Sequence, residues 1–127
     1  MNIDRIDHVV LTVLDVERTC EFYSRVLGMQ AVTFGGGRRA LAFGNQKFNL
    51  HPAGKEYEPR AHTALPGTAD FCLITSVPLE QVISHLDACG VEIALGPVEQ
   101  TGAAGPIRSV YFRDPDLNLV EVANTLS

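Results

Sequence analysis

This chain of 127 residues lacks long apolar runs, paired cysteines and an excess of basic residues. Its apolar stretches are only a few residues long and it begins Met-Asn-Ile-Asp, so we expect neither a transmembrane helix nor a secretory signal. Its three cysteines, Cys20, Cys72 and Cys89, form no Cys-x-x-Cys pair of the kind found in zinc ribbons and redox sites. The sequence therefore predicts a cytoplasmic protein with reduced cysteines in its core.

The charge balance excludes a further class of partner. The sequence has 10 Lys and Arg residues and 15 Asp and Glu residues, which give a formal net charge of -5. This balance argues against nucleic acid as a partner, because affinity for nucleic acid comes largely from contacts with its phosphates. With 46% hydrophobic residues the chain can bury a substantial core. We expect one compact domain, residues 1–127, that binds a small molecule and no membrane.

The first half of the chain predicts one strand, one helix and three further strands. Residues 4–13 alternate in character and are rich in β-branched side chains, which favours a strand. Asp15 is a suitable N-cap for a helix, and Gly28 is a typical residue at which a helix ends. Glycine-containing turns separate the later strands, which are expected at 29–34, 39–44 and 47–51.

The second half repeats this order after an irregular linker at 52–68 that contains Pro and Gly. A strand at 70–75 is followed by a helix that opens near Pro78 and ends at Gly90. The simplest account is an internal duplication with a period of about 60 residues, giving an α+β chain with modules at 1–51 and 69–127. The last strands are expected near 91–95, 107–113 and 118–124, with a Gly-rich loop at 101–106.

Two side chains that can bind metal stand in otherwise apolar strands at opposite ends of the chain. These are His8, in the strand Ile6 to Val13, and Glu121, in the strand Asn118 to Val122. A partnerless imidazole or carboxylate in such a strand would cost several kcal/mol if it were buried. We therefore expect a ligand to bind between them.

The sequence resembles the vicinal oxygen chelate superfamily, which includes glyoxalases, bleomycin resistance proteins and ring-cleaving dioxygenases. The resemblance covers essentially the whole chain, and it implies two tandem βαβββ modules with curved mixed sheets. The motifs that carry it are Asp7-His8-Val9-Val10-Leu11-Thr12-Val13, Phe22-Tyr23-x-x-x-Leu27-Gly28 and Phe112-Arg113-Asp114-Pro115-Asp116-x-Asn118-Leu119-Val120-Glu121. Two further motifs resemble small lactoylglutathione lyase-like proteins, Gln46-Lys47-Phe48-Asn49-Leu50-His51 and Gly96-Pro97-Val98-Glu99.

The resemblance implies a metal site with ligands from the first and last strands of the modules. His8 and Glu121 match ligand positions directly, and His51 is the third ligand that we expect. Asp70 occupies a position where many relatives have histidine or glutamate, so Asp70 or Asn49 could complete the shell instead. A set of His, His and carboxylate suits Zn, Ni, Co, Mn or Fe, and the sequence does not order these metals. Relatives of this length also imply a two-fold homodimer.

The implied activity is that of glyoxalase I on the hemithioacetal of a 2-oxoaldehyde and a thiol. Glu121 is expected to move the proton, with Asp70 as a second catalytic candidate, and the substrate could be a glutathione adduct. The alternatives are a ring-cleaving dioxygenase or thiol transferase of the same fold, and a non-catalytic binding or resistance protein. The expected substrate-binding residues are Asn49 and the cations Arg38, Arg39, Lys47 and Arg108.

Overall fold

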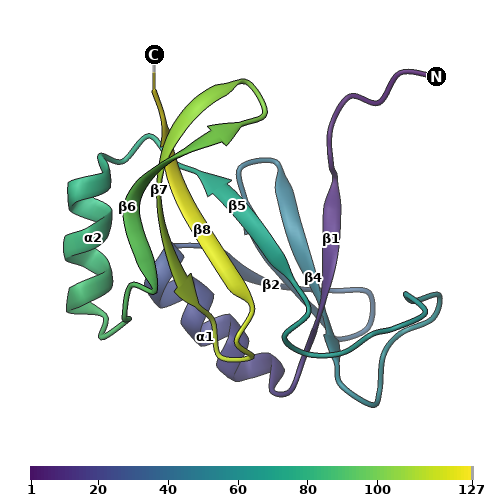
Figure 1. Cartoon of the computed structure of the whole chain (residues 1–127). Coiled ribbons are helices and arrows are strands. Elements are labelled where there is room, and N and C mark those ends of the chain that lie inside the picture. The colour runs from purple at the N-terminus through teal and green to yellow at the C-terminus, as the bar shows by residue number, and fades with distance from the viewer. Residues whose placement is uncertain (127) are drawn as a thin grey trace. The chain divides into compact units, whose positions relative to one another are not determined.

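The computed structural model describes residues 1–126 and divides into two compact units, the first ending at Gly67 and the second beginning at Thr68. Each unit contains a four-stranded sheet and a helix (Figure 1). The first unit consists of β1 (His8–Val13), α1 (Val16–Leu27), β2 (Gln30–Phe34), β3 (Arg38–Phe43) and β4 (Gln46–Pro52). The second consists of β5 (Asp70–Ile74), α2 (Leu79–Ala88), β6 (Leu95–Gly102), β7 (Gly105–Arg113) and β8 (Leu119–Thr125).

The two sheets have the same topology. Their strand orders are β1-β4-β3-β2 and β5-β8-β7-β6, so the first and last strands of each module lie side by side. These two pairs, β1 with β4 and β5 with β8, are parallel, and the remaining pairs are antiparallel. The predicted α+β fold with two βαβββ modules and mixed sheets is therefore confirmed.

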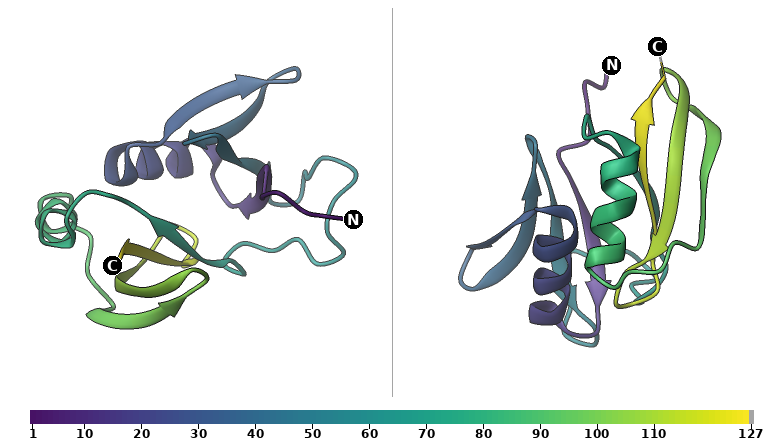
Figure 2. Two further views of the ribbon diagram at one scale, coloured as in Figure 1. Left: turned by 90° about the horizontal axis from the view of Figure 1, so that it is seen from above. Right: turned by 90° about the vertical axis from the view of Figure 1, so that its left-hand side faces the viewer.

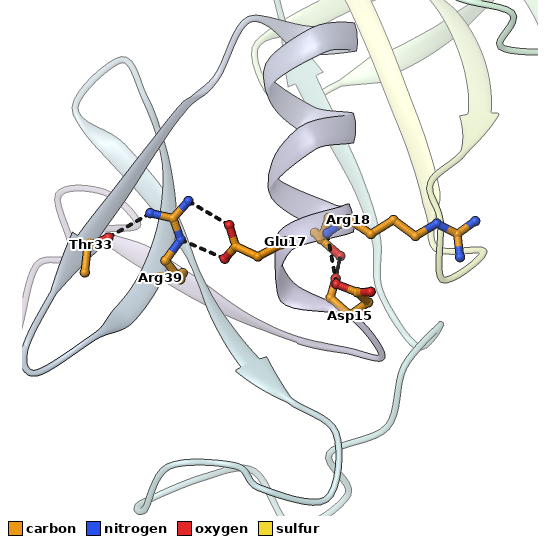
Figure 3. Close-up of polar contacts among 6 residues, drawn as sticks. Asp15, Glu17, Arg18, Thr33 and Arg39 are labelled. Atoms are coloured by element: carbon orange, nitrogen blue, oxygen red, sulfur yellow. Dashed lines mark hydrogen bonds and ion pairs between the residues drawn. The ribbon is translucent and has the colours of Figure 1, made fainter.

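Helix α1 begins and ends where the sequence predicts. The carboxylate of Asp15 accepts a hydrogen bond from the backbone N–H of Arg18 at 3.0 Å, which caps the first turn (Figure 3). Gly28 ends the helix with a φ of 68°, a left-handed conformation that glycine adopts without steric cost. The buried face of the helix packs on its own sheet (Figure 2), where the ring of Tyr23 meets that of Phe48 edge-on at 6.2 Å.

The second unit buries its core between α2 and the middle of its sheet. The helix contacts β7, and its residues Leu79 and Leu86 are buried, as are Val110 and Phe112 of β7 and Val120 of β8. Burying each such side chain contributes about 1.5–3 kcal/mol, so this layer stabilises the unit that carries Glu121. Within residues 1–126, no helix has the length and apolar character needed to cross a membrane.

One predicted strand is wrong. Residues 91–94 lie outside the strands, and β6 instead runs from Leu95 to Gly102 and pairs with β7. The sequence pattern misled because Gly96 and Pro97 look like residues that break a strand. β6 is an edge strand, however, where proline is tolerated, and a register shift lies between Leu95 and Val98. The expected Gly-rich loop at 101–106 is only a two-residue turn, 103–104.

The three cysteines form no disulfide within residues 1–126, but they are not all core residues. Cys20 of α1 is buried, Cys89 is half-buried, and Cys72 on β5 is exposed. The expectation of a core position is therefore wrong for Cys72, because β5 is an edge strand whose alternate side chains face away from the helix.

Candidate functional site

Each sheet has one face covered by its helix and an opposite face that we call the helix-free face. Strand parity and register place the predicted site residues on these faces, since alternate side chains share one side of a strand. On the first sheet the register pairs His8 with Lys47, Val10 with Asn49, and Thr12 with His51. On the second sheet it pairs Asp70 with Leu119 and Cys72 with Glu121.

Glu121 is half-buried at the centre of the helix-free face of the second sheet. Its neighbours in register are Tyr111 on β7 and Cys72 on β5. The hydroxyl of Ser109, a fully buried residue of β7, donates a hydrogen bond to Oε2 of Glu121 at 2.5 Å. This bond fixes one carboxylate oxygen and orients the group on the sheet.

The groups beside Glu121 remain protonated. Burial and, to a smaller extent, the Glu121 carboxylate together raise the pKa of the Cys72 thiol to about 11. The pKa of Tyr111 is raised by the same two causes in the same order. At neutral pH both side chains therefore carry their protons and can donate to the carboxylate. Cys72 is accordingly a poor nucleophile, because the thiolate is the reactive form.

Glu121 lines two hollows on this face, each of about 580 Å³. The first also contacts Cys72, Tyr111 and the hairpin between β6 and β7. The second is lined by Asp70, Tyr111 and Arg113 as well as by Glu121. Hollows of this size suit small organic ligands, and the second brings the two predicted catalytic carboxylates, Asp70 and Glu121, to one place.

His8 differs from what the sequence predicts about its surroundings. Its Nδ1 lies 2.8 Å from Oδ2 of Asp7, and 45% of its side chain is exposed. The premise of a buried and partnerless imidazole is therefore wrong for His8, because β1 begins at an exposed edge with an acid beside it. The hydrogen bond from His8 lowers the pKa of the Asp7 carboxyl.

His51 is almost fully buried, with 2% exposure. Its Nε2 lies 3.4 Å from Nη2 of Arg38, and its ring meets that of Tyr57 edge-on at 5.2 Å. Burial lowers the pKa of His51, and the neighbouring Arg38 guanidinium lowers it further. His51 is thus a neutral imidazole beside a permanent cation, a setting that opposes a second cation at the same nitrogen.

His8 and His51 do not lie together. The register places His51 beside Thr12, four residues along β1 from His8, which is about 13 Å at the usual rise of a strand. Among residues 1–126, no group of three His, Cys, Asp or Glu side chains is placed to hold a metal ion. Of the expected ligands, His8 and His51 belong to the first unit and Glu121 to the second.

The predicted cationic anchors divide between the two faces. Arg39 lies on the helix side of β3, where its guanidinium binds both carboxylate oxygens of Glu17 and the hydroxyl of Thr33 (Figure 3). Arg108 likewise faces α2 and pairs with Glu80 at 3.5 Å. Arg38 and Lys47 instead share the helix-free face of the first sheet with Asn49 and His51.

Several residues around these groups are not among those predicted from the sequence. Ser109, Tyr111 and Cys72 could have been found from strand parity, because each shares a face with Glu121 or Asp70. Tyr57 lies in the irregular segment after β4, and no periodic signal in the sequence marks it.

Comparisons with known proteins agree on the family. The model of the Glyoxalase/Bleomycin resistance protein/Dioxygenase superfamily matches residues 5–122. The virulence protein STM3117 of Salmonella typhimurium is 54% identical over 123 residues, which are 97% of this chain and 85% of that protein. An integron cassette protein from the mobile metagenome of V. cholerae is 52% identical with a TM-score of 0.97, covering 99% of this chain and 98% of that one.

A more distant solved structure shares the fold alone. The lactoylglutathione lyase of Agrobacterium tumefaciens is 21% identical with a TM-score of 0.74, covering 98% of this chain and 96% of that one.

Proposed function

Because this chain belongs to the Glyoxalase/Bleomycin resistance protein/Dioxygenase superfamily, we propose that it is an isomerising lyase of glyoxalase I type. Its substrate is the hemithioacetal of a small 2-oxoaldehyde and a thiol such as glutathione. The observation that carries the proposal is the Glu121 carboxylate, which is oriented by Ser109 and opens onto two hollows of ligand size.

The step assigned to Glu121 is a proton shuttle between neighbouring carbons. Its carboxylate takes the proton from the carbon that bears the hydroxyl and the thiol, and returns it to the adjacent carbonyl carbon. The hydroxyl becomes the carbonyl of a thioester and the carbonyl becomes a hydroxyl, so atoms and electrons balance within one molecule. Tyr111 and Cys72, both protonated, orient the carboxylate from either side.

A divalent metal suits this chemistry, and His8 and Glu121 are the residues that we propose would hold it. Their imidazole nitrogen and carboxylate oxygen are donors that Zn, Ni, Co, Mn and Fe accept. Asp70 supports the assignment as a further carboxylate, because it lines the same hollow as Glu121. We leave His51 out of this set because of the Arg38 guanidinium beside it. When bound, such an ion polarises a substrate oxygen as a Lewis acid.

Metal content and turnover together test the proposed function. The purified protein, loaded in turn with each of the five metals, is assayed with methylglyoxal and glutathione and analysed for bound metal. We expect stoichiometric metal and thioester formation in the native protein. His8→Ala should lose the metal while its circular dichroism is unchanged, because His8 is an exposed residue at the start of an edge strand. His62→Ala, an exposed histidine outside the strands, is the matched control.

The same measurements separate the alternatives. If the protein binds stoichiometric metal but forms no thioester, the glyoxalase reaction would be rejected in favour of a dioxygenase or thiol transferase reaction of the same fold. Failure to bind metal under every loading condition would favour a binding or resistance protein.

We propose further that the protein is a two-fold homodimer, with the first module of one chain beside the second module of the other. The outermost strands β1 and β5 support this, because both present exposed apolar side chains, among them Val10 at 44% and Ile74 at 57% exposure. Such edges are sites at which sheets associate. Sedimentation equilibrium should give twice the chain mass, and a monomer across the micromolar range would contradict the dimer.

A further inference from the structure

Two adjacent arginines on β3 have opposite surroundings. Arg39 points to the helix side, where the Glu17 carboxylate and the Thr33 hydroxyl take its guanidinium hydrogens (Figure 3). Arg38 points to the helix-free face and makes no ion pair with any acid among residues 1–126, and its Nε is buried without a hydrogen-bond partner. Buried guanidinium groups are normally paired, so Arg38 lacks an anion that Arg39 has.

A second cation lies beside Arg38. The Arg38 guanidinium carbon is 5.3 Å from the ring centroid of Phe34, and Nζ of Lys47 is 3.9 Å from the same centroid. The two charges are therefore no farther apart than about one Debye length at 0.1 M salt, about 10 Å, and they repel each other. Lys47 also makes no ion pair within residues 1–126. An anion bound between Arg38 and Lys47 would reduce the repulsion between them and would form an ion pair with each.

The acids near these groups already have partners. Asp7, whose carboxyl pKa is lowered in part by the charge of Lys47, is hydrogen-bonded to His8 at 2.8 Å. Glu56 and Glu58 follow β4, and both pair with Arg60, at 3.6 Å and 3.4 Å. Glu56 also accepts a hydrogen bond from the backbone N–H of Gly54 at 2.6 Å. These contacts hold the carboxylates of Glu56 and Glu58 within their own segment. Neither carboxylate forms an ion pair with Arg38 or Lys47.

His51 adds a donor to the same place. A guanidinium can only donate hydrogen bonds, so the contact from Arg38 Nη2 to His51 Nε2 makes Nε2 the acceptor. The proton of the neutral ring then resides on Nδ1, and this buried N–H has no hydrogen-bond partner among residues 1–126. Beside the Arg38 guanidinium there are thus two orphan donors, Nε of Arg38 itself and Nδ1 of His51. Orphan donors call for an acceptor.

We propose that the helix-free face of the first sheet binds the carboxylate of a small organic molecule between Arg38 and Lys47. A planar carboxylate matches the fork of a guanidinium, and the rings of Phe34 and Tyr57 provide apolar surface for the rest of the ligand. Arg38 and Lys47 are both partly exposed, so a ligand reaches their charged groups from solvent. Arg38 and Lys47 are two of the cations expected to bind the substrate, but the carboxylate site does not depend on the proposed reaction, because it uses neither Glu121 nor a metal.

The test is a nuclear magnetic resonance titration of the full chain with benzoate, and with benzamide as its neutral isostere, at constant ionic strength. We expect benzoate to shift the amide resonances of β3 and β4 saturably and to bind at least about tenfold more tightly than benzamide. This difference in affinity is the one expected between a ligand that makes a charge-assisted hydrogen bond and a neutral ligand that does not. Equal binding of the two compounds, or no binding of benzoate, would overturn the proposal.

Two arginine variants make the test specific. Arg38→Gln should weaken benzoate binding at least about tenfold, while Arg39→Gln, the matched variant one residue away on the opposite face, should leave it unchanged. Unaltered binding in Arg38→Gln would reject the site, and inorganic phosphate that displaces benzoate with equal affinity would reject the organic carboxylate. Titration of the metal-free Glu121→Gln protein distinguishes failure of this site from failure of the proposed reaction, because the site should survive there intact.

Discussion

Replacing Glu121 by glutamine is expected to lower thioester formation from methylglyoxal and glutathione by about 10²- to 10⁴-fold, the usual contribution of a general base. The amide cannot accept the proton from the substrate carbon, but its oxygen can still accept the hydrogen bond from Ser109. The fold and the two hollows should therefore persist, and the loss should appear in kcat. Steady-state kinetics of the metal-loaded variant, with its metal content measured alongside, provide the check.

Glu99→Gln is the matched control for that variant. Glu99 lies on β6 of the same sheet, but its register partner is Arg108, so it belongs to the helix side and not to the face of Glu121. Its replacement should leave turnover unchanged. Full activity in Glu121→Gln with metal still bound would transfer the role of base to Asp70, which lines the same hollow.

The fold was predictable because its signals are local. Alternation marked most of the strands, Asp15 and Gly28 marked the ends of α1, and the repeat of the same order revealed the duplication. β6 was missed because its sequence contains Pro97, whose missing N–H matters little at the edge of a sheet. What decides such a case is the position of a strand within the sheet, which periodicity does not report.

The candidate site was predictable only in part. Alternation along a strand is a property of the sequence, and with the register of β1 and β4 it places His8, Asn49 and His51 on one face. It did not reveal that Arg38 lies against His51, or that Ser109 holds Glu121 from the neighbouring strand. These contacts depend on the register between strands, and Tyr57 reaches His51 from a segment with no periodic pattern.

Asp114→Ala should destabilise the protein by about 3 kcal/mol, because the Asp114 side chain organises the turn that leads into β8. Asp114 is 3% exposed, and its Oδ1 accepts the backbone N–H groups of Asp116 at 2.9 Å and Asn118 at 3.0 Å. Its Oδ2 accepts the Nδ2 hydrogen of Asn118 at 2.8 Å, and Oδ1 of Asn118 in turn accepts the N–H of Ala69. Alanine removes the acceptor of three donors in a buried setting.

Urea unfolding measures this loss, with Asp87→Ala on the exposed side of α2 as a control that should stay within about 0.5 kcal/mol of the native protein. The stability of Asp114→Asn should fall between those of Asp114→Ala and Asp87→Ala, since asparagine keeps the Oδ1 acceptor but turns an N–H group toward the amide of Asn118.

The turn matters for function because a slip of one residue in β8 would move Glu121 to the helix face. Asp114→Ala should therefore also lower turnover, and native stability in this variant would mean that the register of β8 is fixed by its core side chains alone.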